Sequence, residues 1–463
     1  MKKFFGFLAS TQLKAMLVKA GVFLGLVFGA MFWLPLVFVT IALVCAIIIF
    51  ERNFKSVYYV VFLIPFDAAF YLYLSPAYNT FPVIYAFFIV FHFVLYICKA
   101  RISIFKDKVF ILILVVSAYI IFSPLVFGFS IFWSSLTGTA TRIIGVLFFL
   151  YLAIRNREQL VLKDFSIFVV SGILISAVFG LFIRLGDRGQ DIMSWDYIHI
   201  GQRYFGLINA NPNVFHMIIL AAIFCLFALS IKKQINFKKV LPSLIVLGAF
   251  LALSVLGVLT KSLTFYIAYA MIVLAFVIIK IISKENTKKQ KLIFLGLFLL
   301  AIIVTSAIAH QQIIETFERL MSLDTSTNLD GEHTHDPGRI GLMLRHLRGW
   351  YHSFLTFVFG NGMGNSYQDI YNLPSYSPHN MYVFLLWGGG IIGFGLVLST
   401  LICLFITATK TSFRKNLGII IMFVACFAIV TMTETFIITP AFPIAFISFF
   451  LFVSNADDSR SVK

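Results

Sequence analysis

The stretch SPHNMYVFLLWGGGIIGFG, residues 377–395, places a histidine at the mouth of a long apolar segment that contains a cluster of glycines. Ser377 and Pro378 are typical of a helix N-cap and first helical residue, which puts His379 in the first turn. There the positive end of the helix dipole and partial desolvation disfavour the imidazolium form. A neutral imidazole is the form that a general base needs. The alternative is an ordinary histidine at a membrane interface.

The glycines of this segment recur on one face of the expected helix. Gly390 is eleven residues beyond His379, about three helical turns or about 16 Å deeper, and returns to the same face. Gly389 and Gly393 form a small-xxx-small pair, which permits close approach of another helix or of a lipid chain. The spacing therefore predicts a packing groove below the histidine.

Arginines are a second set of candidate functional residues. Arginine presents a permanently charged planar fork that binds phosphate oxygens in a bidentate way. Arg345 and Arg348 are three residues apart on an expected helix, so they share a face, and Arg339 lies near the start of that helix. Arg142 and Arg203 lie on the same side of the expected membrane. The alternative for each of these arginines is pairing with an acidic side chain of the same loops.

Other polar motifs give weaker signals. In RYFGLINANPN, residues 203–213, Asn211 can cap a helix that begins at Pro212, which would point free amides outward beside Arg203, as an anion site needs. The alternative is an ordinary cap. Glu434 and Asp67 are acids in apolar surroundings, which in membranes are functional candidates by default. The cluster His333, His335 and Asp336 has no specific metal-ligand spacing, and we expect no metal.

The elements that position these side chains are membrane helices. Hydrophobic residues make up 60% of the chain, charged residues 12%, and the mean hydropathy is +0.98, whereas about 25% charged residues is usual in soluble domains. Each apolar run near 20 residues can cross a hydrocarbon core of about 30 Å. The first two spans form a single apolar run, which we divide at Leu34-Pro35 only because the parity of the span count requires it, and we expect 12–14 spans in total. They lie at about 15–32, 34–50, 57–74, 82–98, 108–127, 136–154, 165–184, 213–231, 239–259, 263–280, 292–309, 381–409, 416–434 and 438–454.

The distribution of lysine predicts the topology. The lysine-rich connectors all fall on one side of these spans, which the positive-inside rule assigns to the cytoplasm together with both termini. The net charge of +17 therefore reflects topology and gives no reason to expect nucleic acid as a partner. The expected domains are 1–184, an N-terminal transmembrane bundle; 185–212, a periplasmic loop; 213–309, central transmembrane helices; 310–378, a large periplasmic loop; 379–454, C-terminal transmembrane helices; and 455–463, a cytoplasmic tail.

The large loop is too apolar for simple disorder. Loops longer than about 12–15 residues are usually functional or disordered. This one contains Trp350, Tyr351, Phe354, Phe357 and Phe359. We expect it to form amphipathic helices that cap the bundle at the membrane surface.

Together these motifs resemble the bacterial O-antigen ligase and O-antigen polymerase superfamily of membrane glycosyltransferases. His379-Asn380, nine residues, Gly390, two residues and Gly393 fit the H-N-x9-G-x-x-G signature of that family. The other similar segments are Arg203…Gly206…Asn211-Pro212-Asn213, Gly338-Arg339, Gly360-Asn361-Gly362 and Thr433-Glu434-Thr435. The chain departs from the family at LTKSLT, where Leu263 stands in place of a frequent arginine and Lys261 could supply the charge.

The resemblance implies an all-α, GT-C-like polytopic protein of the bacterial inner membrane with a periplasmic active site. It would be an inverting, metal-independent enzyme without a cofactor, which transfers a glycan from undecaprenyl diphosphate to a hydroxyl of an acceptor glycolipid. The implied base is His379, and the implied diphosphate-binding residues are Arg203, Arg339, Arg345 and Arg142. Supporting residues would be Asn380, Asn211, Asn213, Lys261 and Glu434, and the lipid or helix groove would be Gly389, Gly390 and Gly393. Membrane lipids would also be partners. The protein partners would be a chain-length regulator and a flippase.

The identity of the acceptor distinguishes two activities that the resemblance allows. A polymerase attacks with a second lipid-linked repeat unit, whereas a ligase attacks with a sugar of the lipid A core. The outer surface is short of lysine and the large loop is net acidic, which favours a polymerase, because a phosphorylated core would suit a more basic loop. A polysaccharide-lipid transporter is a third alternative. It would require charged residues near the midplane, broken helices and internal repeats.

Overall fold

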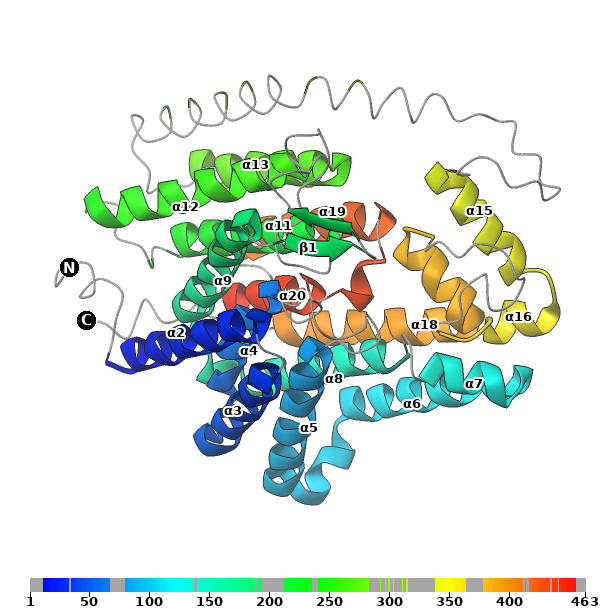
Figure 1. Ribbon diagram of the computed structural model, residues 1–463. Coiled ribbons are helices and arrows are strands. Elements are labelled where there is room, and N and C mark those ends of the chain that lie inside the picture. The colour runs from blue at the N-terminus through cyan, green and yellow to red at the C-terminus, as the bar shows by residue number, and fades with distance from the viewer. Residues whose placement is uncertain are drawn as a thin grey trace. The chain divides into compact units, whose positions relative to one another are not determined.

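The computed structural model describes most of the apolar segments and little of the long loops (Figure 1). The described residues are 11–32, 35–66, 80–136, 140–182, 184–187, 190–193, 212–232, 234, 240–260, 262–282, 292, 296, 299, 303, 310, 314, 338–363, 378–410, 413, 416–433, 435–439 and 441–454.

The chain forms two compact units, each made of separate stretches of sequence. The first unit comprises Met1–Lys99, Leu152–Leu295 and Pro443–Lys463, and the second comprises Ala100–Tyr151 and Gly296–Phe442. The domain division expected from the loops follows different boundaries and stays a prediction.

The first unit consists mainly of helices. They are α2 (Thr11–Phe32), α3 (Pro35–Glu51), η1 (Phe54–Ser56), α4 (Val57–Leu63), α5 (Thr80–Ala100), η6 (Arg157–Gln159), α9 (Leu162–Phe182), α11 (Pro212–Ile231), α12 (Val240–Leu259), α13 (Leu263–Ile282) and most of α20 (Ala441–Ser454). Helix α11 is central, because 89% of Val214–Ile231 is buried and the helix contacts α9, α12 and α13.

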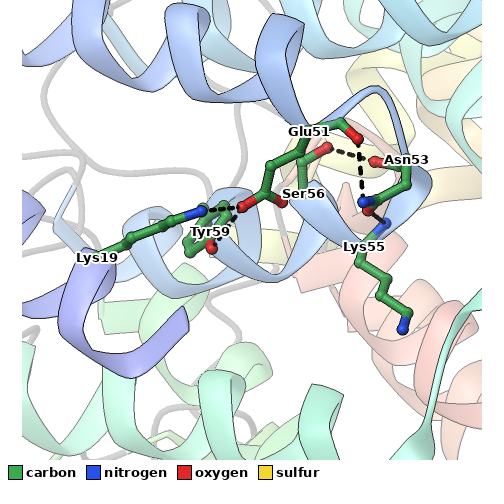
Figure 2. Close-up of polar contacts among 6 residues, drawn as sticks. All are labelled: Lys19, Glu51, Asn53, Lys55, Ser56 and Tyr59. Carbon is green, nitrogen blue, oxygen red and sulfur yellow. Dashed lines mark hydrogen bonds and ion pairs between the residues drawn. The ribbon is translucent and has the colours of Figure 1, made fainter. Parts of the chain in front are cut away.

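Helices α2 and α3 form an antiparallel hairpin in the first unit. Lys19 Nζ lies 2.5 Å from Glu51 Oε1, and the Tyr59 hydroxyl donates to the same carboxylate oxygen at 3.0 Å (Figure 2). Lys19 and Glu51 are equally far from Pro35 along the chain, on either side of it, so their contact requires the two helices to run in opposite directions. Helix α2 ends at Phe32 and α3 begins at Pro35, a favoured first helical residue. The break predicted at Leu34-Pro35 is therefore confirmed.

The turn after α3 connects this hairpin to other helices of the first unit. Asn53 caps η1, because its side chain accepts from the Lys55 amide at 3.0 Å and donates to the Glu51 carbonyl at 3.1 Å (Figure 2). The Ser56 hydroxyl lies 3.0 Å from Nε2 of the buried His92 on α5. The polar groups of the turn are thus satisfied within the chain, as an apolar environment demands.

A two-stranded hairpin departs from the expectation of an all-α chain. Strand β1 (Arg184–Asp187) pairs antiparallel with β2 (Gln190–Met193), with Arg184 opposite Met193. The two connecting residues of the sequence are Arg188-Gly189, and glycine is favoured in two-residue hairpin connections. The stretch predicted as a loop from residue 185 therefore begins with strands.

The second unit is built around one long helix, α18 (Met381–Thr409), which contacts α6, α15, α16 and α19. The elements of this unit are η3 (Arg101–Lys106), α6 (Lys108–Phe122), η4 (Ser123–Phe127), α7 (Phe129–Ser135), most of α8 (Thr141–Arg155), α15 (Gly338–Trp350), α16 (Phe354–Phe359), α18, α19 (Leu417–Thr433) and η8 (Phe436–Ile438).

Five of the described helical segments are long and apolar enough to cross a membrane. They are Lys108–Phe127, Leu162–Gly180, Val214–Ile231, Thr264–Ile281 and Met381–Thr409. Each coincides within a few residues with a predicted span, and the first and the last have the predicted bounds. The protein is therefore a predominantly helical membrane protein. The number of spans, 12–14, stays a prediction.

Candidate functional site

His379 lies immediately before α18 and not in its first turn. The helix begins at Met381, and its N-cap is Asn380, whose side-chain oxygen accepts from the amides of Tyr382 and Val383 at 3.0 Å each. The expectation that Ser377 caps the helix is therefore wrong. The physical reason is that Asn380, itself a preferred cap residue, satisfies two amides of the first turn at once.

The backbone of His379 is left-handed. Its φ is 46°, and only one other non-glycine residue in the described ranges, Arg52, has a positive φ. Histidine tolerates this conformation better than most residues, but a residue held there still carries a free-energy cost of about 1–3 kcal/mol. Such strain persists where surrounding contacts fix the backbone, and it is frequent at functional sites.

The side chain of Asn380 makes the contacts that fix the backbone next to His379. While its oxygen caps α18, its side-chain nitrogen donates to the Met432 carbonyl near the end of α19 at 3.0 Å. The Thr431 hydroxyl also donates to the Tyr382 hydroxyl at 3.0 Å. One amide side chain thus joins the start of α18 to the end of α19, directly beside His379.

A second histidine, His346, lies on α15, which contacts α18. His346 is buried, its Nδ1 donates to the Leu342 carbonyl at 2.8 Å, and its ring packs edge-on against the buried Trp387 with centroids 5.1 Å apart. Burial lowers the pKa of His346 below its ordinary value, the positive charges of Arg345 and His379 lower it further, and the hydrogen bond to Leu342 opposes this shift. His346 is therefore neutral at neutral pH.

Helix α18 is broken at Gly390. Its φ of 62° and ψ of −170° are not helical, which removes nearby carbonyls from the regular hydrogen-bond pattern. The turn after α16 supplies two amide groups that donate to these carbonyls in place of helical amides. The Asn361 amide donates to the Trp387 carbonyl at 2.7 Å, and the Gly362 amide donates to the Gly388 carbonyl at 2.9 Å.

The hydroxyl of Tyr119 on α6 forms hydrogen bonds with the backbone of α18 at the break. It donates to the Gly389 carbonyl at 2.8 Å and hydrogen-bonds to the backbone of Gly393. In a regular helix Gly389 and Gly393 would bond to each other, so the hydroxyl is inserted between them. A Cβ on Gly393 would lie 2.8 Å from the Tyr119 ring, which explains why this position has no side chain.

The expected groove is filled by the chain itself at these positions. A Cβ on Gly390 would lie 2.3 Å from the Val358 carbonyl oxygen, and a Cβ on Gly389 would lie 2.7 Å from the Met363 side chain. The small-xxx-small spacing allowed either another protein segment or a lipid chain in this groove. The structure places protein segments beside Gly389 and Gly390.

One of the predicted arginines lies next to His346 on a helix that contacts α18. Arg345 is half-buried on α15, and its charge lowers the pKa of His346. Arg348 is exposed on the same helix, whose predicted existence is confirmed. Arg142 is exposed at the start of α8, and the backbone of Arg339 is the second residue of α15.

The remaining predicted residues lie wholly or partly outside the described ranges. The side chains of Arg339 and Asn213 are not described, although both residues are helical. Residues that lie outside the described ranges altogether are Arg203, Asn211, Lys261, Glu434, Asp67, His333, His335 and Asp336. Their proposed roles stay predictions.

Sequence reasoning missed two side chains that the structure places at this site. His346 had one available signal, because Leu342, His346 and Gly349 follow a helical spacing that marks the buried face of α15. Tyr119 had no such signal, because nothing local distinguishes it from the other tyrosines of the apolar segments. Within the ranges that the structure describes, no group of three histidine, cysteine or acidic side chains could hold a metal ion.

Comparison with known proteins adds no assignment. No family model, no curated protein and no solved structure matches the chain.

Proposed function

We propose that this protein is an inverting, metal-independent membrane glycosyltransferase that uses a glycan linked to undecaprenyl diphosphate. The acceptor hydroxyl attacks the anomeric carbon, the bond from that carbon to the phosphate oxygen breaks, and undecaprenyl diphosphate leaves with the electron pair. His379 accepts the proton of the attacking hydroxyl. The observation that carries this proposal is the strained His379 held beside an arginine-bearing helix.

The strain supports a role for His379 that packing does not provide. The other three residues of its H-N-x9-G-x-x-G pattern have structural roles: Asn380 caps and links two helices, Gly390 breaks α18, and Gly393 leaves room for Tyr119. These contacts fix the position of His379, whose side chain is half-buried. A rigid support of this kind is what a general base requires.

The arginines of α15, the helix that contacts α18, support a diphosphate as the leaving group. Arg345 precedes His346 on this helix, Arg348 is exposed on it, and Arg339 belongs to its first turn. Guanidinium groups can stabilise the negative charge that develops on the leaving diphosphate, the task that a metal ion performs in other enzymes. Arg203 and Arg142 belong to this proposal as further diphosphate-binding residues.

The proposal includes a GT-C-like bundle of 12–14 spans in the bacterial inner membrane, with cytoplasmic termini and a periplasmic site. The acceptor that we favour is a second lipid-linked repeat unit, which makes the protein a polymerase of O-antigen or another surface polysaccharide. The ligase alternative, with the lipid A core as acceptor, uses the same donor chemistry. The two differ in the glycolipids of a deletion strain: single repeat units on the core indicate a polymerase, and bare core with accumulated lipid-linked polymer indicates a ligase.

The direct test is glycan transfer by the purified full-length chain in proteoliposomes that contain the lipid-linked donor. We expect His379→Ala to lower the transfer rate about 10²–10⁴-fold, the usual contribution of general base catalysis. His352→Ala is the matched control, because His352 is an exposed histidine of the same unit, and it is expected to retain the wild-type rate. Near wild-type transfer by His379→Ala would show that the base is another group. Unchanged surface glycans in the deletion strain would exclude both the polymerase and the ligase.

A further inference from the structure

Two basic segments of the first unit, residues 52–55 and 155–163, lie side by side although they are far apart in the sequence. The Phe54 amide donates to Gln159 Oε1 at 2.9 Å, and the Val161 amide donates to the Tyr58 hydroxyl at 2.7 Å. These two hydrogen bonds hold the turn after α3 against the connection between α8 and α9. The lysines and arginines of both segments therefore gather at one place in the fold.

The basic residues of this place are all exposed or half-exposed, and we call them the basic surface: Arg52, Lys55, Arg155, Arg157 and Lys163. Acids are fewer within the two segments and the residues that flank them. Glu51 is paired with Lys19, which leaves the exposed Glu158 and the half-buried Asp164, whose carboxylate interacts with two of these cations. Positive charge therefore exceeds negative charge at the basic surface, as an anionic ligand requires.

Arg52 has a backbone conformation that glycine adopts more easily. Its φ is 50°, and its amide donates to the Ile48 carbonyl at 3.4 Å, which is the bond of a helix that ends in a left-handed residue. Glycine is the usual residue at such a position because it has no Cβ. The side chain of Arg52 is exposed, so packing within the chain does not explain why an arginine stands there. Strain of this kind is frequent where a side chain serves a function.

The basic surface is flanked by exposed apolar side chains. Phe50, two residues before Arg52, is 83% exposed, and Val161, two residues before Lys163, is 43% exposed. In a membrane protein such apolar side chains contact acyl chains, while lysines and arginines at the helix ends reach the headgroups. A lipid with an anionic headgroup matches both features, whereas a soluble anion matches the cations only.

We propose that the basic surface binds the headgroup of an anionic phospholipid, with phosphate oxygens on Arg52 and Lys55 and an acyl chain against Phe50. The guanidinium group of Arg52 supplies a fork for two phosphate oxygens, and the ammonium group of Lys55 supplies a point charge. In Figure 2 the side chain of Lys55 extends away from the Glu51 carboxylate. Clusters of lysine and arginine beside membrane helices bind anionic headgroups in this way. The site is separate from the proposed transfer reaction, because its residues belong to the first unit and His379 to the second.

The test is native mass spectrometry of the purified full-length chain in a neutral detergent. Cardiolipin is the anionic probe, phosphatidylcholine is the zwitterionic control, and we expect the wild type to bind cardiolipin more tightly. One lysine or arginine near a headgroup contributes about fivefold in affinity for an anionic lipid. Arg52→Gly and Lys55→Gln are therefore each expected to weaken cardiolipin binding about fivefold and to leave phosphatidylcholine binding unchanged. Arg52→Gly loses the strain but also the favourable charge at the end of α3, so its unfolding midpoint should stay close to that of the wild type.

Lys410→Gln is the matched control, because it removes one positive charge from an exposed lysine of the second unit. It is expected to keep the wild-type affinity for cardiolipin. Unchanged cardiolipin binding by Arg52→Gly and Lys55→Gln would overturn the proposal. An equal loss in Lys410→Gln would also overturn it, because binding would then follow net charge and not this surface. Displacement of cardiolipin by an equal concentration of inorganic pyrophosphate would show that the surface selects a soluble anion and not a lipid.

Discussion

The break in α18 gives the sharpest structural prediction, through the substitution Gly390→Ala. Gly390 lies at the point where the turn after α16 meets the helix, and its backbone is in direct contact with that turn. A Cβ there would lie 2.3 Å from the Val358 carbonyl oxygen and 2.5 Å from the Gly360 nitrogen. Both are backbone atoms, so no side-chain rotation can relieve the overlap.

The expected cost of Gly390→Ala has two parts. Alanine at φ 62° and ψ −170° occupies a region that is essentially restricted to glycine, at about 1–3 kcal/mol. Moving the turn away would also break the amide bonds of Asn361 and Gly362 at 2.7 and 2.9 Å, each worth about 0.5–1.5 kcal/mol net. The total is on the order of 2–6 kcal/mol, a large share of a typical stability of about 5–15 kcal/mol.

The assay is unfolding of the purified protein in detergent micelles, followed by far-ultraviolet circular dichroism. Gly395→Ala is the matched control, because Gly395 lies in the same helix and a Cβ there meets nothing within 4 Å. Alanine is preferred over glycine in a helix by about 1 kcal/mol, so the control is expected to be neutral or slightly more stable. Equal stability of Gly390→Ala and the wild type would refute the role assigned to this break.

Three further predictions test other contacts. Tyr119→Phe removes the hydroxyl inserted into α18 and should lower the stability by about 1–3 kcal/mol; an unfolding midpoint equal to that of Tyr351→Phe, an exposed control, would contradict this. Asn380→Ala should cost about 0.5–2 kcal/mol as a lost cap and reduce transfer more than Asn380→Ser, which can still cap; equal transfer rates would argue against its positioning of the base. Lys19→Met and Glu51→Gln, combined in a double-mutant cycle, should give a coupling of about 0.2–1 kcal/mol, since the lysine is 41% exposed; zero coupling would remove the ion pair as a determinant of the α2–α3 hairpin.

The spans were predictable because hydropathy is a local property of the chain. The bounds 381–409 were found from the apolar run alone, and the division of the first apolar run at Leu34-Pro35 followed from the parity of the span count. The N-cap of α18 was predicted at Ser377, whereas the structure places it at Asn380. Ser377, His379 and Asn380 are all polar residues near a helix start, and which one caps depends on hydrogen bonds to the first turn and to α19 that local pattern does not contain.

The sequence by itself determined a helical membrane protein, the position of its long spans, and a short list of polar residues at the helix ends. It did so because composition, charge and periodicity act within a few residues. The tertiary structure decided that Tyr119 is inserted between Gly389 and Gly393, and that the ring of His346 packs against Trp387. These contacts join residues far apart in the chain, so they depend on how helices pack and on which broken backbone hydrogen bonds must be satisfied away from water.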